Sequence, residues 1–264
     1  MNGHQRIRAV LADSAGAAFL PFMTAGFPTP AVSADLFMAM ADAGADAFEV
    51  GIPYSDPLMD GPVIMQASQV ALAAGTDIRV AFEIIEQVAS RTGKPVLAMT
   101  YANPVMQVGW EAFVEKLASA GAAGIIVPDL PLEESGPVRT AASSRGIGVV
   151  QFVSPMSNNQ RIDAVAAADP AFIYGVADMG VTGERPSTSA HTQALSERVR
   201  DRTAAPLVLG VGISTPEQAR AVRALADGVI VGSAMVRRVL DADSFTDAAR
   251  SLSEAAAAFA AALH

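Results

Sequence analysis

The sequence predicts an α/β fold, a (β/α)8 barrel with an extra N-terminal helix, on three observations. Short apolar, β-branched runs recur along the chain, and segments with helical periodicity lie between most of them. Apolar residues make up 51% of the chain and charged residues 17%, a balance that fits strands buried on both faces. The length of 264 residues is ordinary for one such barrel, so we expect a single domain over residues 1–264.

Eight apolar runs are candidate strands: Phe19–Met23, Ala47–Gly51, Val96–Thr100, Gly124–Val127, Gly148–Phe152, Phe172–Val176, Pro206–Gly210 and Gly228–Val231. Helical periodicity between them is clear at Val32–Ala43, Ile78–Ser90, Trp110–Ala120 and Pro216–Ala224. Strands that alternate with helices indicate a parallel sheet with right-handed crossovers, and eight such units suggest a closed TIM barrel. A doubly wound open sheet is the main alternative.

Turn and cap residues agree with these boundaries. "DAGAD" (Asp42–Asp46) and "SAGAAG" (Ser119–Gly124) place a glycine between a helix end and the next strand. "STPEQA" (Ser214–Ala219) has a Ser or Thr cap, a first-turn proline and then a glutamate. Two long irregular connections, Pro53–Pro62 and Asp178–His191, follow the second and sixth strands. Both follow carboxyl ends of strands, where the active sites of such barrels lie.

Composition excludes several classes of protein. A formal net charge of −9 makes the chain a poor ligand for nucleic acid or for an anionic membrane surface. The absence of cysteine excludes disulfides, thiolate catalysis and Cys-ligated metals. No uninterrupted apolar run reaches the length of about 18 residues that a membrane span needs, and the first residues lack the apolar segment of a signal peptide. We therefore expect a cytoplasmic protein.

Glycine motifs predict a phosphate site. "GVTG", "GVGIS" and "VGSA" follow the sixth, seventh and eighth strands, and barrels frequently bind phosphate after the last two strands. Glycines allow backbone N–H groups to approach an anion closely. A tight turn explains each motif taken alone, but their joint placement favours phosphate. The candidate residues are Gly183, Val211, Gly212, Gly232 and Ser233.

Acidic residues follow the second strand. Glu49 lies inside an apolar run, where desolvation should raise its pKa and suit it to proton transfer near neutral pH. Asp60 lies eleven residues later, with Asp56 between them. A buried ion pair with an arginine is the alternative for Glu49, and turn chemistry is the alternative for Asp56 and Asp60.

The positions of the bases narrow the chemistry. Of the two lysines, Lys94 precedes the third strand and Lys116 falls in a helix, so neither suits a Schiff-base mechanism at the other end of the barrel. The three histidines, His4, His191 and His264, are scattered and suggest no metal site. Bond cleavage would therefore depend on carboxylate acid–base chemistry.

Six motifs, in order between about Phe19 and Val236, resemble the tryptophan synthase alpha subunit family: "PFMTAGFPTP", "FEVGIPYSDPLMDGP", "TYANPV", "PDLPLEES", "GVTG" and "GVGISTPEQA". "GIPYSDPLMDGP" is the most specific, whereas the glycine motifs occur in other phosphate-binding barrels. The resemblance implies a lyase of tryptophan biosynthesis, which cleaves indole-3-glycerol phosphate to indole and glyceraldehyde 3-phosphate by a retro-aldol reaction. A stand-alone indole-3-glycerol-phosphate lyase, another phosphate-binding barrel enzyme and a non-catalytic activator of a beta subunit are the alternatives.

The same resemblance implies roles for particular residues. Glu49 would protonate the indole C3 and take the proton of the side-chain hydroxyl, and Asp60 would hold the indole N–H. Thr182 would bond Asp60 when its loop closes. The indole would be lined by residues near Leu130 and by Phe22, Ile64, Met99, Tyr101 and Tyr174.

The resemblance also implies a partner, a beta subunit that carries pyridoxal phosphate in an alpha2beta2 heterotetramer, and no cofactor in this chain. Residues expected to face that partner are Asp56, Pro57, Asn103 and Pro104. Two places depart from the family pattern. Ala177-Asp178 replaces a polar pair such as Ser-Arg, and Val211 replaces a phenylalanine beside the phosphate.

Overall fold

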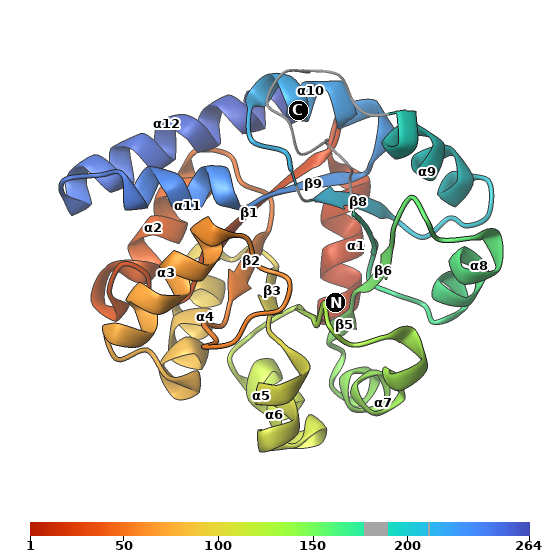
Figure 1. Cartoon of the computed structure of the whole chain (residues 1–264), viewed down its shortest axis with the longest axis horizontal. Helices are drawn as coiled ribbons and strands as arrows, with labels where there is room; N and C mark the ends of the chain where they lie inside the picture. The colour runs from red at the N-terminus through yellow and green to blue at the C-terminus, as the bar shows by residue number, and fades with distance from the viewer. Residues whose placement is uncertain (177–189, 211) are drawn as a thin grey trace.

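The computed structural model describes residues 1–176, 190–210 and 212–264, and its parallel strands form one sheet that wraps into a barrel (Figure 1). The strands are β1 (Ala18–Thr24), β2 (Phe48–Gly51), β3 (Val96–Met99), β4 (Gly124–Ile126), β5 (Gly148–Val149), β6 (Gln151–Val153), β7 (Ile173–Val176), β8 (Leu207–Gly210) and β9 (Gly228–Val231). Their order in the sheet is β5-β4-β3-β2-β1-β9-β8-β7-β6.

The sheet closes through a single residue. Its two edge strands, β5 and β6, are separated only by Val150, so nine segments occupy the eight predicted strand positions. The Val150 N–H donates to the Ile125 carbonyl at 3.1 Å, and the Ala171 N–H donates to the Val149 carbonyl at 2.8 Å. The interrupted strand, β5 with β6, is thus hydrogen-bonded on one side to β4 and on the other to the residues that lead into β7. The closed barrel is confirmed, and the open-sheet alternative is wrong.

Helices surround the barrel (Figure 1), and along the chain most of them lie between one strand and the next. They are α1 (Gly3–Asp13), α2 (Pro30–Asp42), α3 (Pro62–Ala73), α4 (Ile78–Thr92), α5 (Ala102–Val108), α6 (Trp110–Ser119), α7 (Gly136–Arg145), α8 (Asn159–Ala167), α9 (Ala190–Arg200), α10 (Pro216–Val222), α11 (Ser233–Leu240) and α12 (Phe245–Leu263). Short 3-10 turns cover Leu132–Glu134 and Arg223–Leu225. The four expected helices correspond to α2, α4, α6 and α10. His191, expected at the end of a loop, lies in the first turn of α9.

The expected caps form as the sequence indicates. Gly44 and Gly121 follow α2 and α6 with φ angles of 104° and 75°, a region that favours glycine. The Thr215 side chain caps α10, and its partner in the capping box is Gln218 rather than the neighbouring Glu217. In the described ranges, no helix is both long and apolar enough to cross a membrane.

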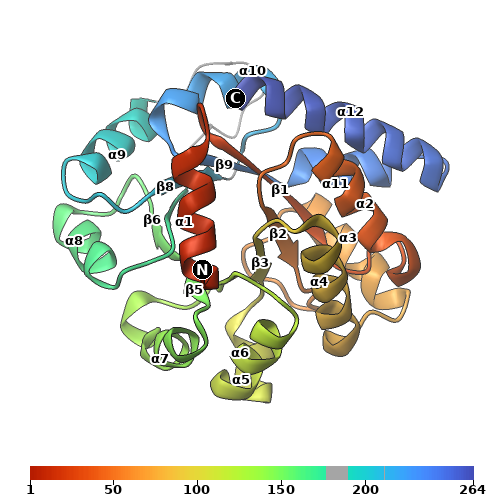
Figure 2. The ribbon, with the colours of Figure 1, turned by 180° about the vertical axis from the view of Figure 1, so that it is seen from behind.

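Helix α1 covers the N-terminal end of the barrel, in front in Figure 2, and confirms the expected extra helix. Its Ile7 and Leu11 are 1% and 5% exposed. The Ile7 Cδ1 atom lies only 2.8 Å from where a Cβ on Gly124 would stand, and Leu11 Cδ2 lies equally close to that position on Gly228. Glycines at the starts of β4 and β9 therefore make room for the side chains of α1.

Replacing Ile7 by Ala should lower the free energy of unfolding by about 2–4 kcal/mol, because the cavity it leaves faces backbone that cannot collapse inward. Urea denaturation measures the change. Asp13→Ala, at an exposed position of the same helix, is the matched control and should stay within about 0.5 kcal/mol of the wild type. An Ile7→Ala effect no larger than that of the control would show that α1 is not part of the core.

Candidate active site

Glu49 lies inside the barrel at the second position of β2. In the sheet register it stands beside Phe22 of β1 and Leu97 of β3, so these three side chains share the inner face of the wall. Glu49 is 5% exposed, and its Oε2 atom has no hydrogen-bond partner. Among the described residues no arginine or lysine lies within ion-pair distance of it, so the arginine-pair alternative is not observed.

Burial, and secondarily the charge of Asp60, raises the pKa of Glu49 from its ordinary value of 4.5 to about 8. A carboxyl group of this kind is largely protonated at neutral pH and still close enough to its pKa to exchange the proton. The environment therefore poises Glu49 for both donation and acceptance.

Asp60 belongs to the connection between β2 and α3, and its carboxylate is bonded to a distant part of the chain. The Tyr101 hydroxyl, just beyond β3, donates to Asp60 and accepts the Met59 N–H at 3.2 Å. Burial raises the pKa of Asp60, and the Tyr101 bond opposes that rise. The partner of Asp60 is thus not local, whereas Asp56 is exposed and takes its bond from the adjacent Ser55 hydroxyl at 2.5 Å. Turn chemistry describes Asp56 but not Asp60.

Two aromatic rings fit into the barrel because glycines stand opposite them. A Cβ on Gly51, the last residue of β2, would lie 2.5 Å from the Phe22 ring. A Cβ on Gly210, the last residue of β8, would lie 2.1 Å from the Tyr174 hydroxyl. Tyr174 stacks on Phe152 at a centroid distance of 5.0 Å. Burial, with the charge of Glu49, raises the pKa of Tyr174, which places the ring beside that carboxyl.

Gly51 was not among the residues predicted for the site, and Gly210 appeared only as the first residue of the "GVGIS" motif, with no role of its own. The available signal was their position, because each is the last residue of a strand immediately before a predicted site loop. Their function depends on a ring supplied by another strand, and only the folded structure shows which ring that is.

The remaining apolar candidates are Ile64, Met99 and residues near Leu130. Ile64 in the first turn of α3 and Phe22 both lie under 4 Å from where a Cβ on Gly232 would stand. Met99 ends β3, is half-buried and pairs in register with Gly51. Leu130, half-buried beyond β4, packs against the barrel core. The structure thus brings Phe22, Ile64 and Gly232 into one place.

The described phosphate candidates follow two adjacent strands. Gly212 comes after β8 with a φ of 81°, and Gly232 joins β9 to α11, which begins at Ser233. Strands β8 and β9 pair directly, so the two connections emerge side by side. The candidates Thr182, Gly183 and Val211 lie outside the described residues, as does the departure at Ala177-Asp178.

The expected partner-facing residues lie at the same end of the barrel as Glu49 and Asp60. Asp56 and Asn103 are exposed, while Pro57 and Pro104 are half-buried. The Asn103 amide donates to the Tyr54 hydroxyl at 2.8 Å, and the rings of Tyr54 and Tyr101 lie 5.6 Å apart. This chain of contacts, in which Tyr54 was not foreseen, connects the outer surface to the tyrosine that bonds Asp60.

The two lysines lie at the places that the sequence predicted. Lys94 precedes β3 at the N-terminal end of the barrel, and Lys116 of α6 lies 6.0 Å from the Phe82 ring centroid. In the part of the chain that the structure describes, no three His, Cys, Asp or Glu side chains are grouped so that they could hold a metal ion.

Glu49 should make stability depend on pH. Its pKa is about 8 in the folded chain and 4.5 ordinarily, so the folded state holds an extra proton between these values. The contribution of Glu49 to the free energy of unfolding therefore falls as pH rises through this window, by up to about 1.4 kcal/mol per pH unit. Below pH 4.5 and above pH 8 this contribution no longer changes with pH. Denaturation of wild type and Glu49→Gln from pH 5 to 8.5 should show the variant gaining relative stability with pH. A constant difference would contradict the raised pKa.

A barrel with a buried carboxyl inside its wall and a second acid in the loop after the same strand has the layout of a TIM-barrel enzyme site. Residues 9–264 match the family model described as tryptophan synthase alpha chain. The chain belongs to the tryptophan synthase alpha chain family, which is a family of lyases.

Relatives and solved structures agree with this assignment. The tryptophan synthase alpha chain of Streptomyces coelicolor is 44% identical over 226 residues, which are 86% of this chain and 83% of that protein. The alpha chain of Legionella pneumophila superposes with a TM-score of 0.88 at 29% identity, covering 100% of this chain and 97% of that one. Tryptophan synthase from M. tuberculosis in its aminoacrylate-bound form gives a TM-score of 0.87 at 30% identity, with both chains fully covered.

Proposed function

We propose that Glu49 carries the proton transfers of the family reaction, the retro-aldol cleavage of indole-3-glycerol phosphate to indole and glyceraldehyde 3-phosphate. The observation that supports this role is the buried Oε2 atom without a partner, in a carboxyl whose pKa is about 8. A structural carboxyl at this depth would be expected to be paired.

The proposed steps use one carboxyl group twice. Protonated Glu49 donates its proton to C3 of the indole ring. The carboxylate that remains accepts the proton of the hydroxyl group on the glycerol side chain as the bond between that carbon and C3 breaks. The aldehyde and indole leave, and Glu49 is again protonated. No external acid or base is consumed.

Asp60 would hold and polarise the indole N–H, where positive charge develops when C3 is protonated. Its carboxylate is kept in place by Tyr101, and Phe22, Ile64, Met99 and Tyr174 would line the ring. Backbone N–H groups of Gly212, Gly232 and Ser233 would hold the phosphate, with Gly183 and Val211 contributing from outside the described residues. Thr182 would bond Asp60 on loop closure.

Membership of an alpha chain family implies a beta-chain partner and a small-molecule substrate. We propose an alpha2beta2 assembly in which the beta subunit carries pyridoxal phosphate and consumes the indole. Asp56, Pro57, Asn103 and Pro104 would form the contact, and exposed apolar side chains beside them support it: Leu58, Met59 and Met106 are 78%, 65% and 63% exposed. The cytoplasmic location stays a prediction from the sequence.

The decisive experiment measures indole release from indole-3-glycerol phosphate, with and without a tryptophan synthase beta subunit. We expect release by the chain alone and faster release with the partner. Rapid release that the partner leaves unchanged would favour the stand-alone lyase. No release under either condition would overturn the proposal. A non-catalytic activator would still stimulate the beta subunit after both Glu49 and Asp60 were replaced.

A further inference from the structure

Three arginine side chains from neighbouring elements line one pocket on the N-terminal side of the barrel. Arg200 is the last residue of α9, Arg220 lies in the last turn of α10, and Arg223 begins the 3-10 turn after α10. The pocket has a volume of about 400 Å³, and Gly16 and Asp227 also line it. Figures 1 and 2 both show α9 and α10 as neighbours at one edge of the molecule.

The charge of this pocket is opposite to that of the chain. The whole sequence carries −9, yet the pocket has three guanidinium groups and one carboxylate, that of Asp227. One Asp227 oxygen accepts the Leu207 N–H at 2.7 Å, and the other lies 4.0 Å from Arg200 Nη2, at the limit of an ion pair. Asp227 can therefore offset one of the three positive charges, and the pocket keeps an excess of arginines over carboxylates.

The guanidinium groups keep hydrogen-bond donors free for a ligand. Within the described ranges, the Arg220 side chain has no hydrogen bond or ion pair, and its charge helps to lower the pKa of Glu217 on the same helix. Arg223 Nη2 donates to the main-chain oxygen of His264 at 2.5 Å. Its Nε lies 2.3 Å from where a Cβ on Gly16 would stand, so this glycine lets the side chain lie against the backbone. Each guanidinium has five N–H donors, of which these contacts use few.

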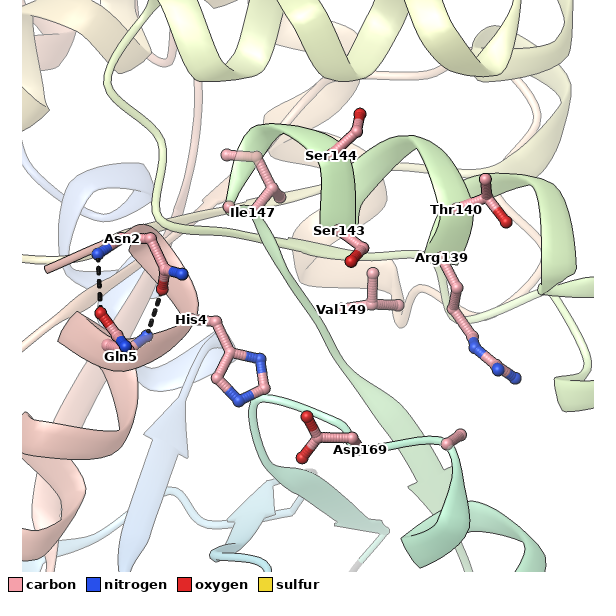
Figure 3. A pocket seen from close by; sticks show the side chains of 12 residues that line it. Asn2, His4, Gln5, Arg139, Thr140, Ser143, Ser144, Ile147, Val149 and Asp169 are labelled. Carbon is pink, nitrogen blue, oxygen red and sulfur yellow. Dashed lines mark hydrogen bonds between the residues drawn. The ribbon is translucent and has the colours of Figure 1, made fainter.

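A second cavity on the same side of the barrel gives a contrast. It has a volume of about 760 Å³ and lies between α1 and α7 (Figure 3). Arg139 of α7 lies on one wall, and His4 and Asp169 lie on the other. Asp169 is ion-paired with Arg8 at 3.0 Å, so this cavity is lined by one arginine, Arg139, where the first pocket has three.

We propose that the pocket of Arg200, Arg220 and Arg223 binds a multiply charged anion of the phosphate type. Three guanidinium groups that line one pocket repel one another, an anion between them relieves that repulsion, and their planar forks match phosphate oxygens in pairs. The pocket lies at the starts of β8 and β9, whereas Gly212 and Gly232 follow the ends of the same strands. It is therefore separate from the proposed substrate phosphate site and independent of the proposed function.

The test titrates inorganic pyrophosphate and inorganic phosphate into the full chain by calorimetry at low ionic strength. Pyrophosphate should bind more tightly than phosphate, because more of its oxygens can pair with the three arginines. Arg220→Gln should weaken the pyrophosphate binding by about tenfold or more, and Arg220→Lys, which keeps the charge but loses the fork, should weaken it less. Arg139→Gln, the same change at the arginine that lines the other cavity, should leave binding unchanged.

Kinetics separate this pocket from the substrate site. Arg220→Gln should leave the KM for indole-3-glycerol phosphate at its wild-type value, and circular dichroism should show an unchanged fold. Wild-type pyrophosphate binding in the Arg200→Gln/Arg220→Gln double variant would overturn the proposal. So would equal affinities for pyrophosphate and phosphate in the wild type, or an equal loss of binding in Arg139→Gln.

Discussion

Replacing Glu49 by Gln is expected to lower kcat for indole release by about 10²–10⁴-fold, the range that general acid–base catalysis supplies. Glutamine has the size of glutamate and can accept a hydrogen bond, but it can neither donate the proton to C3 nor take one from the hydroxyl group. Glu49 is buried and, among the described residues, no arginine or lysine pairs with it, so the neutral amide should be accommodated. Indole release measures kcat, and equilibrium titration of the variant measures substrate binding.

Substrate binding should survive this substitution, because the ring and phosphate contacts come from other residues. Glu86→Gln, on the exposed side of α4, makes the same chemical change at a distance and should leave kcat unchanged. Near-normal turnover in Glu49→Gln would show that another group carries the proton transfers. A parallel loss of binding and turnover would indicate a structural role instead.

Replacing Asp60 by Asn is expected to lower kcat by about a hundredfold or more, the scale for removal of one preorganised electrostatic contact at a developing charge. The asparagine can still accept the indole N–H, but it carries no negative charge to stabilise the protonated ring. The loss should therefore fall on kcat more than on KM. Steady-state kinetics with indole-3-glycerol phosphate measure both constants.

Two variants control the Asp60 experiment. Tyr101→Phe removes the hydroxyl that donates to Asp60 and accepts the Met59 N–H, so it should give a smaller loss in the same direction. Asp243→Asn, exposed between α11 and α12, should have no effect. If Asp60→Asn raised KM and left kcat intact, Asp60 would contribute only binding.

Much of the fold could be predicted because the relevant information is local. Strands such as Val96–Met99 are covered by helices, so they read as short apolar runs. Helix α4 has a clear apolar periodicity and an Asp77 cap, and its boundaries were correspondingly close to those expected. The interruption at Val150 had no sequence signal. The first residues of α9 carry no apolar periodicity, so the sequence predicts a loop as far as His191 where the structure has a helix.

The site was predictable to a different degree for each residue. Glu49 could be identified because an acid within "AFEVG" must be buried if the run is a strand. Asp60 was ambiguous because "DGP" is also a turn sequence. Only Tyr101, 41 residues farther along, separates the two interpretations, since its hydroxyl bonds the Asp60 carboxylate. Gly51 and Gly210 acquire their importance from rings on other strands.

The sequence by itself determined the barrel, its helical cover at the N-terminus, the buried acid and the family, because periodicity, burial and motifs are properties of contiguous residues. The tertiary structure decided which groups meet. In the folded chain a Glu49 oxygen has no hydrogen-bond partner, and the Tyr101 hydroxyl donates to Asp60. Arginines from α9, α10 and the turn after α10 line one pocket. Residues far apart in the chain become neighbours only when the parallel strands close into a barrel, and the charges and hydrogen bonds between them are set at that point.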